Sequence, residues 1–507
     1  MVEQSKLLAQ MLAQAELSVN QVGEKAAELE TRQDMVALEG LILEVVLRLG
    51  AAWLGMVLSQ WAENLAAKAG TRMPCTCGGV ARWVAWRAKT ILSLLGRTTY
   101  WRVYFHCERC GHGQGLGDRQ WGLHKTRTSL GVKQLLGYLS GTTVGFGNVA
   151  RNVCRTLCWP QNWLSGKQVQ RLAEPMGKLL GEQETRRVAR WWALVSAGLS
   201  GLLEAELVPA EIQGQANQDS GRLYVQMDGI MGRLRGVAGA GSDLWREVKV
   251  GAVFWAEAGR HASSLAELLG QVPRSGHKGE GTARPSAPYG VQSKRVWVDR
   301  PQGDITYVAG LLPAAQFGVH LYAEAVARGI ERAREVVVLA DGARWIWQLA
   351  EEHFPGATQI LDFQHAREWV GKVGQAIWGE GSAKAEEWAE RQIVEHLLEG
   401  DAEGLVKAIA ELPQIAPPAG QSKSIPEQAM EYFWNNAERM RYPQYRARGL
   451  EIGSGIVESA GRRVVGVRCK QPGMRWSEEG LSAIIDLRTH ALNHRYDAAL
   501  AHLRKAA

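Results

Sequence analysis

The sequence predicts a multidomain α+β protein that contains an α/β core. Its 507 residues exceed the one to two hundred or so of a typical domain, so several packed units are expected. The hydrophobic share of 46% and the charged share of 22% are those of ordinary globular proteins. Apolar residues recur at the helical spacing of about 3.6 in much of the chain, but near residue 220 the spacing changes to about 2, which is typical of strands.

The chain is basic, with 59 Lys and Arg against 52 Asp and Glu and a formal net charge of +7. This balance favours a polyanionic partner such as nucleic acid, although many basic proteins bind none. The longest uncharged apolar stretch near the start, residues 49–62, falls short of the ~20 residues that span a bilayer. The first residues also lack the pattern of a secretory signal. We therefore expect a cytoplasmic protein without a membrane partner.

Residues 1–70 form the first predicted region, which is helical. Leu7, Leu8, Met11 and Leu12 show the three- and four-residue spacing of apolar side chains on a helix. We interpret the region as a packing or oligomerisation element without active-site residues.

Residues 71–116 carry two pairs of cysteines on Gly-containing turns, Cys75 with Cys77 and Cys107 with Cys110. A strand-like alternation between the pairs indicates a hairpin. Seven cysteines in 507 residues are too few for a disulfide framework. Four thiolates at about 2.3 Å are suitable ligands for a tetrahedral structural Zn²⁺, so the pattern predicts a zinc ribbon.

The first pair departs from the usual two-residue spacer, because only Thr76 separates its cysteines. His106 and His112 therefore remain candidate substitute ligands. The alternative is a set of reduced structural cysteines, which leaves the paired Gly-flanked turns without an explanation.

Residues 117–204 contain three short helical patterns. They cover residues 130–140, 146–158 and 165–180. Ser165 is a suitable N-cap for the third helix. Lys167, Gln168 and Arg171 would then share an exposed face suited to phosphate and base-edge contacts. The arrangement resembles a helix-turn-helix unit that binds DNA, and the alternative is a plain three-helix packing unit.

An acidic and then Gln-rich segment, residues 205–220, is the predicted linker into a second region. The strand candidates that follow cover residues 222–227, 247–255, 296–299, 305–310, 336–340 and 358–361. Residues 272–293 are rich in Gly, Ser, Pro and basic residues and indicate a surface loop. We place the α/β core in residues 218–375 and 446–500, with a helical insertion at 376–445.

Two of these strands are each followed by an Asp-Gly pair, at Asp228 and Asp341. In α/β sheets, ligands collect beyond strand ends, and carboxylates there bind Mg²⁺. Taken singly, each Asp is also compatible with a turn or N-cap role. A third carboxylate, Glu458, follows Gly and Ser residues that begin a helix, where the alternative is a surface pair with Arg462 worth only about 0.2–0.5 kcal/mol. Two Asp and one Glu would suit two divalent ions about 3.5–4 Å apart that cut and join phosphodiesters.

Four motifs occur in one order along the chain. They are DGARWIW at 341–347, ILDFQHA at 360–366, GSGIVES at 453–459 and PGMRWS at 472–477. Together they resemble the transposases of the Kra-type bacterial insertion sequences, and the resemblance runs over most of the chain. It implies a DDE transposase with a ribonuclease-H-like catalytic core, related to Mutator-like transposases.

The resemblance also implies that Asp228, Asp341 and Glu458 are the catalytic metal-binding triad, with Mg²⁺ or Mn²⁺ as the ion. Asp243 is a nearby rival for the first position. Residues 383–440, which are mostly helical in pattern, resemble the all-helical insertion of Mutator-related transposases.

Asp362 and His365 look like the Asp-x-x-His signature of that wider group, and we expect them to be accessory residues. The alternative makes Asp362 the N-cap of a helix, and His365 could bond a phosphate without binding metal. A basic run after the triad is expected to contact DNA phosphates, with a solvated helix face as the alternative. The run consists of Arg462, Arg463, Arg468, Lys470, Arg475 and Trp476.

We therefore expect a DDE transposase that binds the ends of an insertion sequence and performs metal-dependent cleavage and strand transfer on double-stranded DNA. We expect it in the bacterial cytoplasm, associated with the nucleoid. A homo-oligomer is expected because two element ends must be held at once. The alternatives are a catalytically inactive, transposase-derived DNA-binding protein and a two-metal nuclease without strand transfer.

Overall fold

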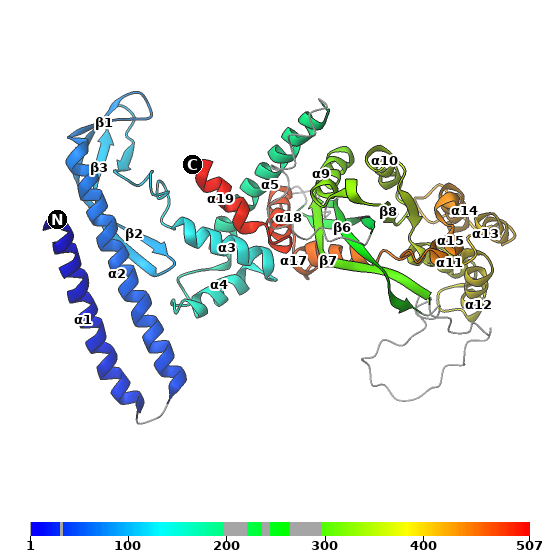
Figure 1. The fold of residues 1–507 in the computed structure, drawn as a ribbon, viewed down its shortest axis with the longest axis horizontal. Coiled ribbons are helices and arrows are strands. Elements are labelled where there is room, and N and C mark those ends of the chain that lie inside the picture. The colour runs from blue at the N-terminus through cyan, green and yellow to red at the C-terminus, as the bar shows by residue number, and fades with distance from the viewer. Residues whose placement is uncertain (1, 31–33, 197–220, 236–243, 264–295, 507) are drawn as a thin grey trace. The chain divides into compact units, whose positions relative to one another are not determined.

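The computed structural model describes residues 2–30, 34–196, 221–235, 244–263 and 296–506. The predicted linker at 205–220, the predicted loop at 272–293 and Asp243 lie outside these residues. The chain divides into two compact units, Met1–Leu179 with Tyr496–Ala507 and Leu180–Arg495. Each unit combines helices with a β-sheet, which confirms the predicted multidomain α+β class (Figure 1).

The first unit begins with two long helices that lie side by side, α1 (Val2–Glu30) and α2 (Met35–Ala69) (Figure 1). The Asp34 carboxylate caps α2 by accepting the Ala37 N–H at 2.9 Å. The helical pattern predicted for this part of the chain is thus confirmed.

Helix α2 is more continuously apolar than the predicted stretch at 49–62. Arg48 bounded that stretch in the sequence, but in the helix it pairs with Glu44 one turn away, at 3.6 Å on the exposed side. By length and composition alone α2 could cross a membrane. One such helix is weak evidence, because core helices of soluble proteins meet the same criteria.

A four-stranded antiparallel sheet follows, in the order β1-β2-β3-β4. Its strands are β1 (Arg72–Pro74), β2 (Val80–Ser93), β3 (Gly96–Cys107) and β4 (Gly113–Gly115). Gly96 closes the β2–β3 hairpin with a φ of +114°, a conformation that favours glycine. Helix α2 approaches β3 at Gly55, where a Cβ atom would lie 2.3 Å from the carbonyl oxygen of Thr99. The missing side chain therefore allows the helix to pack directly on the hairpin.

Three further helices belong wholly or partly to the first unit. They are α3 (Leu130–Thr142), α4 (Phe146–Thr156) and α5 (Gly166–Ser196). Ser129 Oγ caps α3, and Ser165 Oγ accepts the Gln168 N–H at 3.3 Å, as predicted for the start of the third helix. Their apolar sides share one core. Helix α19 (Tyr496–Ala506) joins this unit from the end of the chain.

Helix α5 continues well past the predicted end at residue 180 and contains Pro175. Many charged residues occur in its second half, so the apolar repeat there is weak in the sequence and the helix was predicted to end too early. Ion pairs one turn apart, such as Glu184 with Arg187 at 2.6 Å, nevertheless support a helix there. This half belongs to the second unit, where Trp191 packs with Ala323.

The second unit is built on a five-stranded sheet in the order β7-β6-β5-β8-β9. Its strands are β5 (Arg222–Leu234), β6 (Leu244–Ser263), β7 (Val296–Gly310), β8 (Glu335–Ala340) and β9 (Thr358–Leu361). Strand β6 is antiparallel to both of its neighbours, β5 and β7, whereas β8 and β9 run parallel to β5. The predicted end of β5 at Met227 is wrong, because β6 pairs with it as far as Leu234. The two strands predicted within 296–310 are one continuous strand.

Helices cover both faces of this sheet. On one face, α9 (Ala314–Ala327) packs on β6 and β7. On the other, α16 (Gly455–Gly461) packs on β5 and β6, and α18 (Glu478–Leu492) reaches β5 at Gly232. Two more helices follow the parallel strands, α10 (Arg344–His353) after β8 and α11 (Phe363–Trp378) after β9.

The segment between α11 and α16 is helical, as its pattern predicts. Its elements are α12 (Ala383–Gln392), η3 (Ile393–Leu397), α13 (Ala402–Ala410), α14 (Ile425–Asn436), η4 (Ala437–Arg439) and α15 (Tyr442–Ala447). Its apolar side chains join the core of the sheet. The described part of this unit also contains three short elements, η2 (Ile330–Arg332), η5 (Arg462–Gly466) and α17 (Val467–Cys469).

Candidate functional site

Two of the predicted carboxylates are brought together by the register of parallel strands. Strands β5 and β8 pair as far as Met227 opposite Ala340, so Asp228 and Asp341 are the next residues on each. Gly342, with a φ of +98°, turns the chain away from the sheet at that point. Asp341 Oδ1 accepts the Ala343 N–H at 3.0 Å, at the start of α10.

The environment of Asp228 opposes its ionisation. Burial and the neighbouring charge of Asp341 raise the pKa of the Asp228 carboxyl to about 6, and Glu458 adds to the rise. The Gly229 N–H, which bonds Asp228 Oδ1 at 2.7 Å, acts in the opposite direction. Carboxylates that repel one another in a partly buried place are typical of a site that binds a cation.

Glu458 lies on α16, with its carboxylate beside a second polar cluster. The Ser454 hydroxyl lies 3.0 Å from Glu458 Oε1 and 2.9 Å from Asp362 Oδ2, within donating distance of both. Ligand atoms of Asp362, His365 and Glu458 all lie within 4.8 Å of one another, so this group could hold a metal ion.

Asp362 is fully buried and is the N-cap of α11, as the alternative interpretation had it. Its oxygens accept the N–H groups of Gln364 at 3.2 Å, His365 at 3.1 Å and Ser454 at 3.0 Å. Burial alone would raise the pKa of Asp362, but the hydrogen bond and charge of the His365 ring, together with the bonds from Ser454, hold it below its ordinary value. Asp362 is therefore a carboxylate whose lone pairs are already largely occupied.

His365 is held in its charged form by this carboxylate. Its Nδ1 contacts Asp362 Oδ2, and that hydrogen bond raises the pKa of His365 to about 9 against the opposing effect of burial. Asp341 adds to the rise. In the metal-free protein this pKa favours the imidazolium at neutral pH, which places a positive charge beside the carboxylates, and the ring would have to lose that proton to ligate a metal.

Two residues that the sequence analysis missed fasten the Glu458 segment to the sheet. Tyr224 Oη accepts the Glu451 N–H and Gln226 Oε1 accepts the Val457 N–H, each at 3.0 Å. Both project from β5 on the same face as Asp228, because they precede it by four and two residues. In the sequence, the available signal was a Gln between apolar neighbours two residues before Asp228, and the structure shows that it is wholly buried.

The basic run after Glu458 is only partly exposed. Arg468 and Trp476 are buried against each other, with the guanidinium 5.1 Å from the ring centre, so neither presents the expected surface to DNA. The reason is packing, since a planar guanidinium stacks on an indole. The other members, Arg462, Arg463, Lys470 and Arg475, are exposed.

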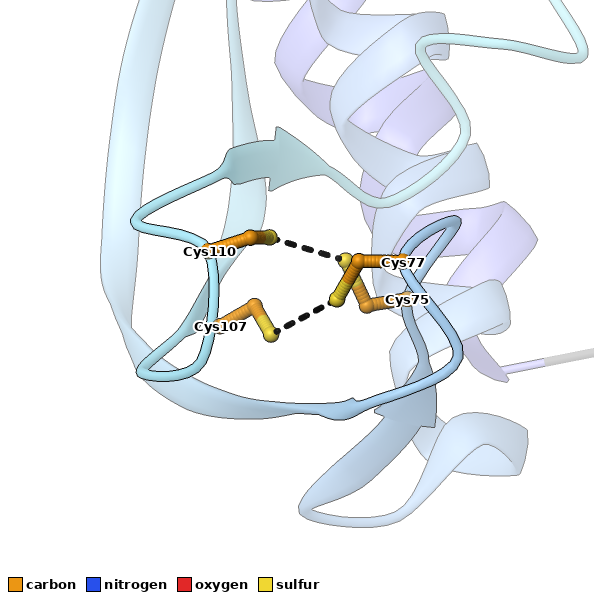
Figure 2. A group of neighbouring side chains, drawn as sticks. All are labelled: Cys75, Cys77, Cys107 and Cys110. Carbon is orange, nitrogen blue, oxygen red and sulfur yellow. Dashed lines mark hydrogen bonds between the residues drawn. The ribbon is translucent and has the colours of Figure 1, made fainter.

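The four predicted zinc ligands converge in the first unit (Figure 2). Cys75 and Cys110 sulfurs lie 3.6 Å apart, and those of Cys77 and Cys107 lie 3.7 Å apart. Four sulfurs at about 2.3 Å around a tetrahedral Zn²⁺ would be about 3.8 Å from one another, so the cysteines fit that ion. The group that could hold a metal ion there consists of these four cysteines and includes neither candidate histidine.

The short spacer of the first pair is accommodated by its turn. The Cys75 N–H bonds the Gly79 carbonyl at 2.8 Å, and the Gly78 N–H bonds the Cys75 carbonyl at 3.0 Å. The backbone N–H of Cys77 is the main cause of a Cys75 thiol pKa lowered to about 7. A thiol that ionises near neutral pH is a ready metal ligand.

The predicted DNA-contacting residues of α5 are exposed at its start. Lys167 and Arg171 project into solvent. Gln168 is exposed as well, but its Oε1 accepts the Ser165 N–H at 2.8 Å while Ser165 Oγ accepts the Gln168 N–H. This reciprocal pair is a capping box, so Gln168 serves the helix start.

Residues 324–499 match the sequence profile of an uncharacterised protein family (UPF0236). The matched region contains Asp341, Asp362, His365 and Glu458, whereas Asp228 precedes it. It covers less than half of the chain. No curated protein matches the chain significantly.

The cysteine cluster predicts one Zn²⁺ per chain. Cys110→Ser, at an exposed cysteine whose replacement disturbs little packing, should remove the metal and lower the thermal midpoint by several degrees. Cys158→Ser is the matched control, because Cys158 lies outside the cluster. Metal content by mass spectrometry and calorimetry provide the readouts. Equal zinc content in the two variants would contradict the assignment.

Burial and charge repulsion at Asp228 predict that this carboxylate lowers the stability of the metal-free protein and contributes to metal binding. Because the folded-state pKa of about 6 exceeds the ordinary 3.8, the metal-free protein should lose stability as pH rises from about 4 through 6. Asp228→Asn should remove that loss and raise the metal-free thermal midpoint at pH 7.5 by a few degrees or so.

The same variant should lose the stabilisation that Mn²⁺ gives the unmutated protein, because a ligand that binds only the folded state raises the free energy of unfolding. Calorimetry with and without Mn²⁺ measures both effects. Asp304→Asn, a change at a described Asp outside the site, is the control. An unchanged Mn²⁺ response in the Asp228 variant would contradict a role in metal binding.

Proposed function

We propose that the protein is a DDE transposase whose second unit is a ribonuclease-H-like catalytic core. The single observation that carries the proposal is the adjacency of Asp228 and Asp341 on paired parallel strands, with Glu458 on a helix bonded to the same sheet and near enough for its charge to raise the Asp228 pKa. The sheet, with three antiparallel strands followed by two parallel ones, supports such a core. The four ordered motifs support the transposase family over other phosphoryl-transfer enzymes.

In this proposal, Asp228, Asp341 and Glu458 are the oxygen ligands that suit Mg²⁺ or Mn²⁺. Bound divalent ions would supply Lewis acidity for the attacking and leaving oxygens of a phosphodiester. Asp362 stays a carboxylate, and its Oδ2 keeps the proton on His365 Nδ1. The His365 cation then attracts a DNA phosphate toward the carboxylates and offsets their mutual repulsion.

Exposed arginines next to this site extend the positive surface. Arg462 and Arg463 begin η5 directly after α16, where they could hold backbone phosphates of the strand to be cut. The first unit would bind the element ends, with Zn²⁺ as its structural ion. Cleavage at each end would free a 3′-hydroxyl, which the same carboxylates would orient against a target phosphate. We expect these steps at the bacterial nucleoid.

A cleavage assay tests this function. Labelled DNA that carries the ends of the element should be cut in Mg²⁺ or Mn²⁺, and Asp341→Asn should slow cutting by on the order of a hundredfold or more, about 3 kcal/mol. A pre-cut 3′ end should be joined to target DNA. Cutting without joining would favour the nuclease alternative. Binding without cutting by either protein would favour the inactive DNA-binding alternative.

A homo-oligomer is part of the proposal, and α1 and α2 offer a surface for it. Leu12 is 61% exposed and Val46 58% exposed, on helices that carry further uncovered apolar residues. Single exposed apolar residues are common, but a group on two adjacent helices is typical of a protein interface.

Sedimentation velocity should therefore detect a dimer or larger species at micromolar concentration. The double variant Leu12→Glu and Val46→Lys should shift it to monomer. Leu17→Glu is the matched control, because Leu17 is 60% exposed and lies more than a third of a turn from Leu12 on α1. A native protein that sediments as a monomer with both element ends bound would contradict the oligomer.

A further inference from the structure

One segment of the first unit carries positive charge that no acidic residue offsets, although residues 71–118 are also basic, with seven Lys and Arg against Glu108 and Asp118. Residues 119–173 contain eight Lys and Arg and no Asp or Glu. By contrast, residues 1–48 carry eight acidic and four basic residues. Because duplex DNA is a polyanion, the segment without acidic residues is where DNA would be attracted, and the acidic start of the chain is not. Helices α3 and α4 and the start of α5 lie in this segment.

The spacing of these helices distinguishes α4 from α5. Only residues 143–145 separate α3 from α4, and this turn ends with Gly145. A three-residue turn with a glycine is the connection of a helix-turn-helix, in which the second helix enters the major groove. Nine residues, 157–165, separate α4 from α5. The tightly linked pair is therefore α3 and α4, with α4 as the second helix.

The two sides of α4 differ sharply. Its buried side consists of Val149, Ala150, Val153 and Cys154, which pack into the core shared by the three helices. Its other side carries Asn148, Arg151, Asn152 and Arg155, of which the last three are exposed. Arg151 Nη2 donates to Asn148 Oδ1, a bond between two side chains of this one side that leaves the other donors of the guanidinium and the Asn148 amide N–H groups for base edges. Amides and guanidinium groups are the side chains that read base edges in the major groove, with Asn suited to adenine and Arg to guanine.

The first turns of α4 and α5 lie next to each other. A Cβ atom on Gly166 would come 3.1 Å from the backbone nitrogen of Gly147, so the two helix starts are in contact. Lys167 and Arg171 on α5 thus flank the exposed side of α4. Gln168, the α5 residue best suited to a base edge, is engaged in the capping box. Helix α5 therefore offers mainly charge, which suits phosphates.

We propose that α4 reads the sequence of the element ends, with Asn148, Arg151 and Asn152 on base edges and Lys167 and Arg171 on the flanking phosphates. This assignment rests on the proposed function, since it assumes that the chain recognises duplex DNA. It moves sequence recognition from the helix predicted by the sequence to the one before it.

The test uses the full chain with Asp341→Asn, so that DNA stays intact, and a library of duplexes with a random 20-base-pair centre. This parent should enrich one sequence. Adding Asn152→Ala or Arg151→Lys should weaken binding to that sequence by roughly 5- to 150-fold. Binding to unselected duplex should persist, because Arg151→Lys keeps the charge but loses the planar fork.

Lys167→Ala should act differently, by weakening binding to all sequences and reducing the slope of log affinity against log salt by about 0.9. Arg186→Ala is the control, because Arg186 is an exposed arginine farther along α5 that pairs with Glu182 at 3.5 Å. Circular dichroism checks that each variant folds. Hydrogen exchange should show protection of the α4 backbone by the enriched duplex.

If the α4 variants enrich the same sequence with the parent's affinity, the assignment to α4 is overturned and the proposed function stands. If the parent enriches no sequence, both the recognition of element ends and the assignment of that recognition to α4 are contradicted. Loss of enrichment in the α4 variants, with retained binding to bulk duplex, supports both.

Discussion

The candidate active site depends on hydrogen bonds that fasten residues 451–457 to the sheet. Glu458 follows Asp341 by 117 positions and is separated from it by a helical segment, so nothing local in the chain brings the two together. Tyr224, Gln226 and Asp362 accept N–H groups from this segment inside the protein, where an unpaired polar group costs free energy. These bonds therefore position α16 and the carboxylate that it carries.

Charge is distributed in a way that serves such a site. Burial, together with repulsion from Asp341 and Glu458, keeps the pKa of Asp228 near 6, so the metal-free site is not at its most stable. His365 is kept cationic beside them by Asp362, a buried residue whose own oxygens are otherwise engaged. Stability is thus lower at the place where we propose that a cation binds, a common feature of functional sites.

Much of the fold could be predicted from the sequence because local patterns specify local structure. The apolar run at β8, the short strand β9 and the Ser165 cap were predicted with nearly correct ends, and the insertion was predicted to be helical without bounds for its separate helices. Predictions failed where pairing partners decide an element's length. Gly229 looked like a turn after Asp228, but β6 pairs past it and keeps it in the strand. The burial of Arg468 on Trp476 likewise follows from packing and not from spacing.

The sequence by itself determined which residues have suitable chemistry: paired cysteines for a metal, and carboxylates next to glycine turns. Their residue types and spacing carry that information. Only the tertiary structure determined which of these residues lie next to one another. The register of β5 against β8 places Asp228 beside Asp341, and the hydrogen bond from the Val457 N–H to Gln226 holds the helix that carries Glu458 against the same sheet. Strand register and long-range hydrogen bonds join residues far apart in the chain, and local sequence patterns do not encode such distances.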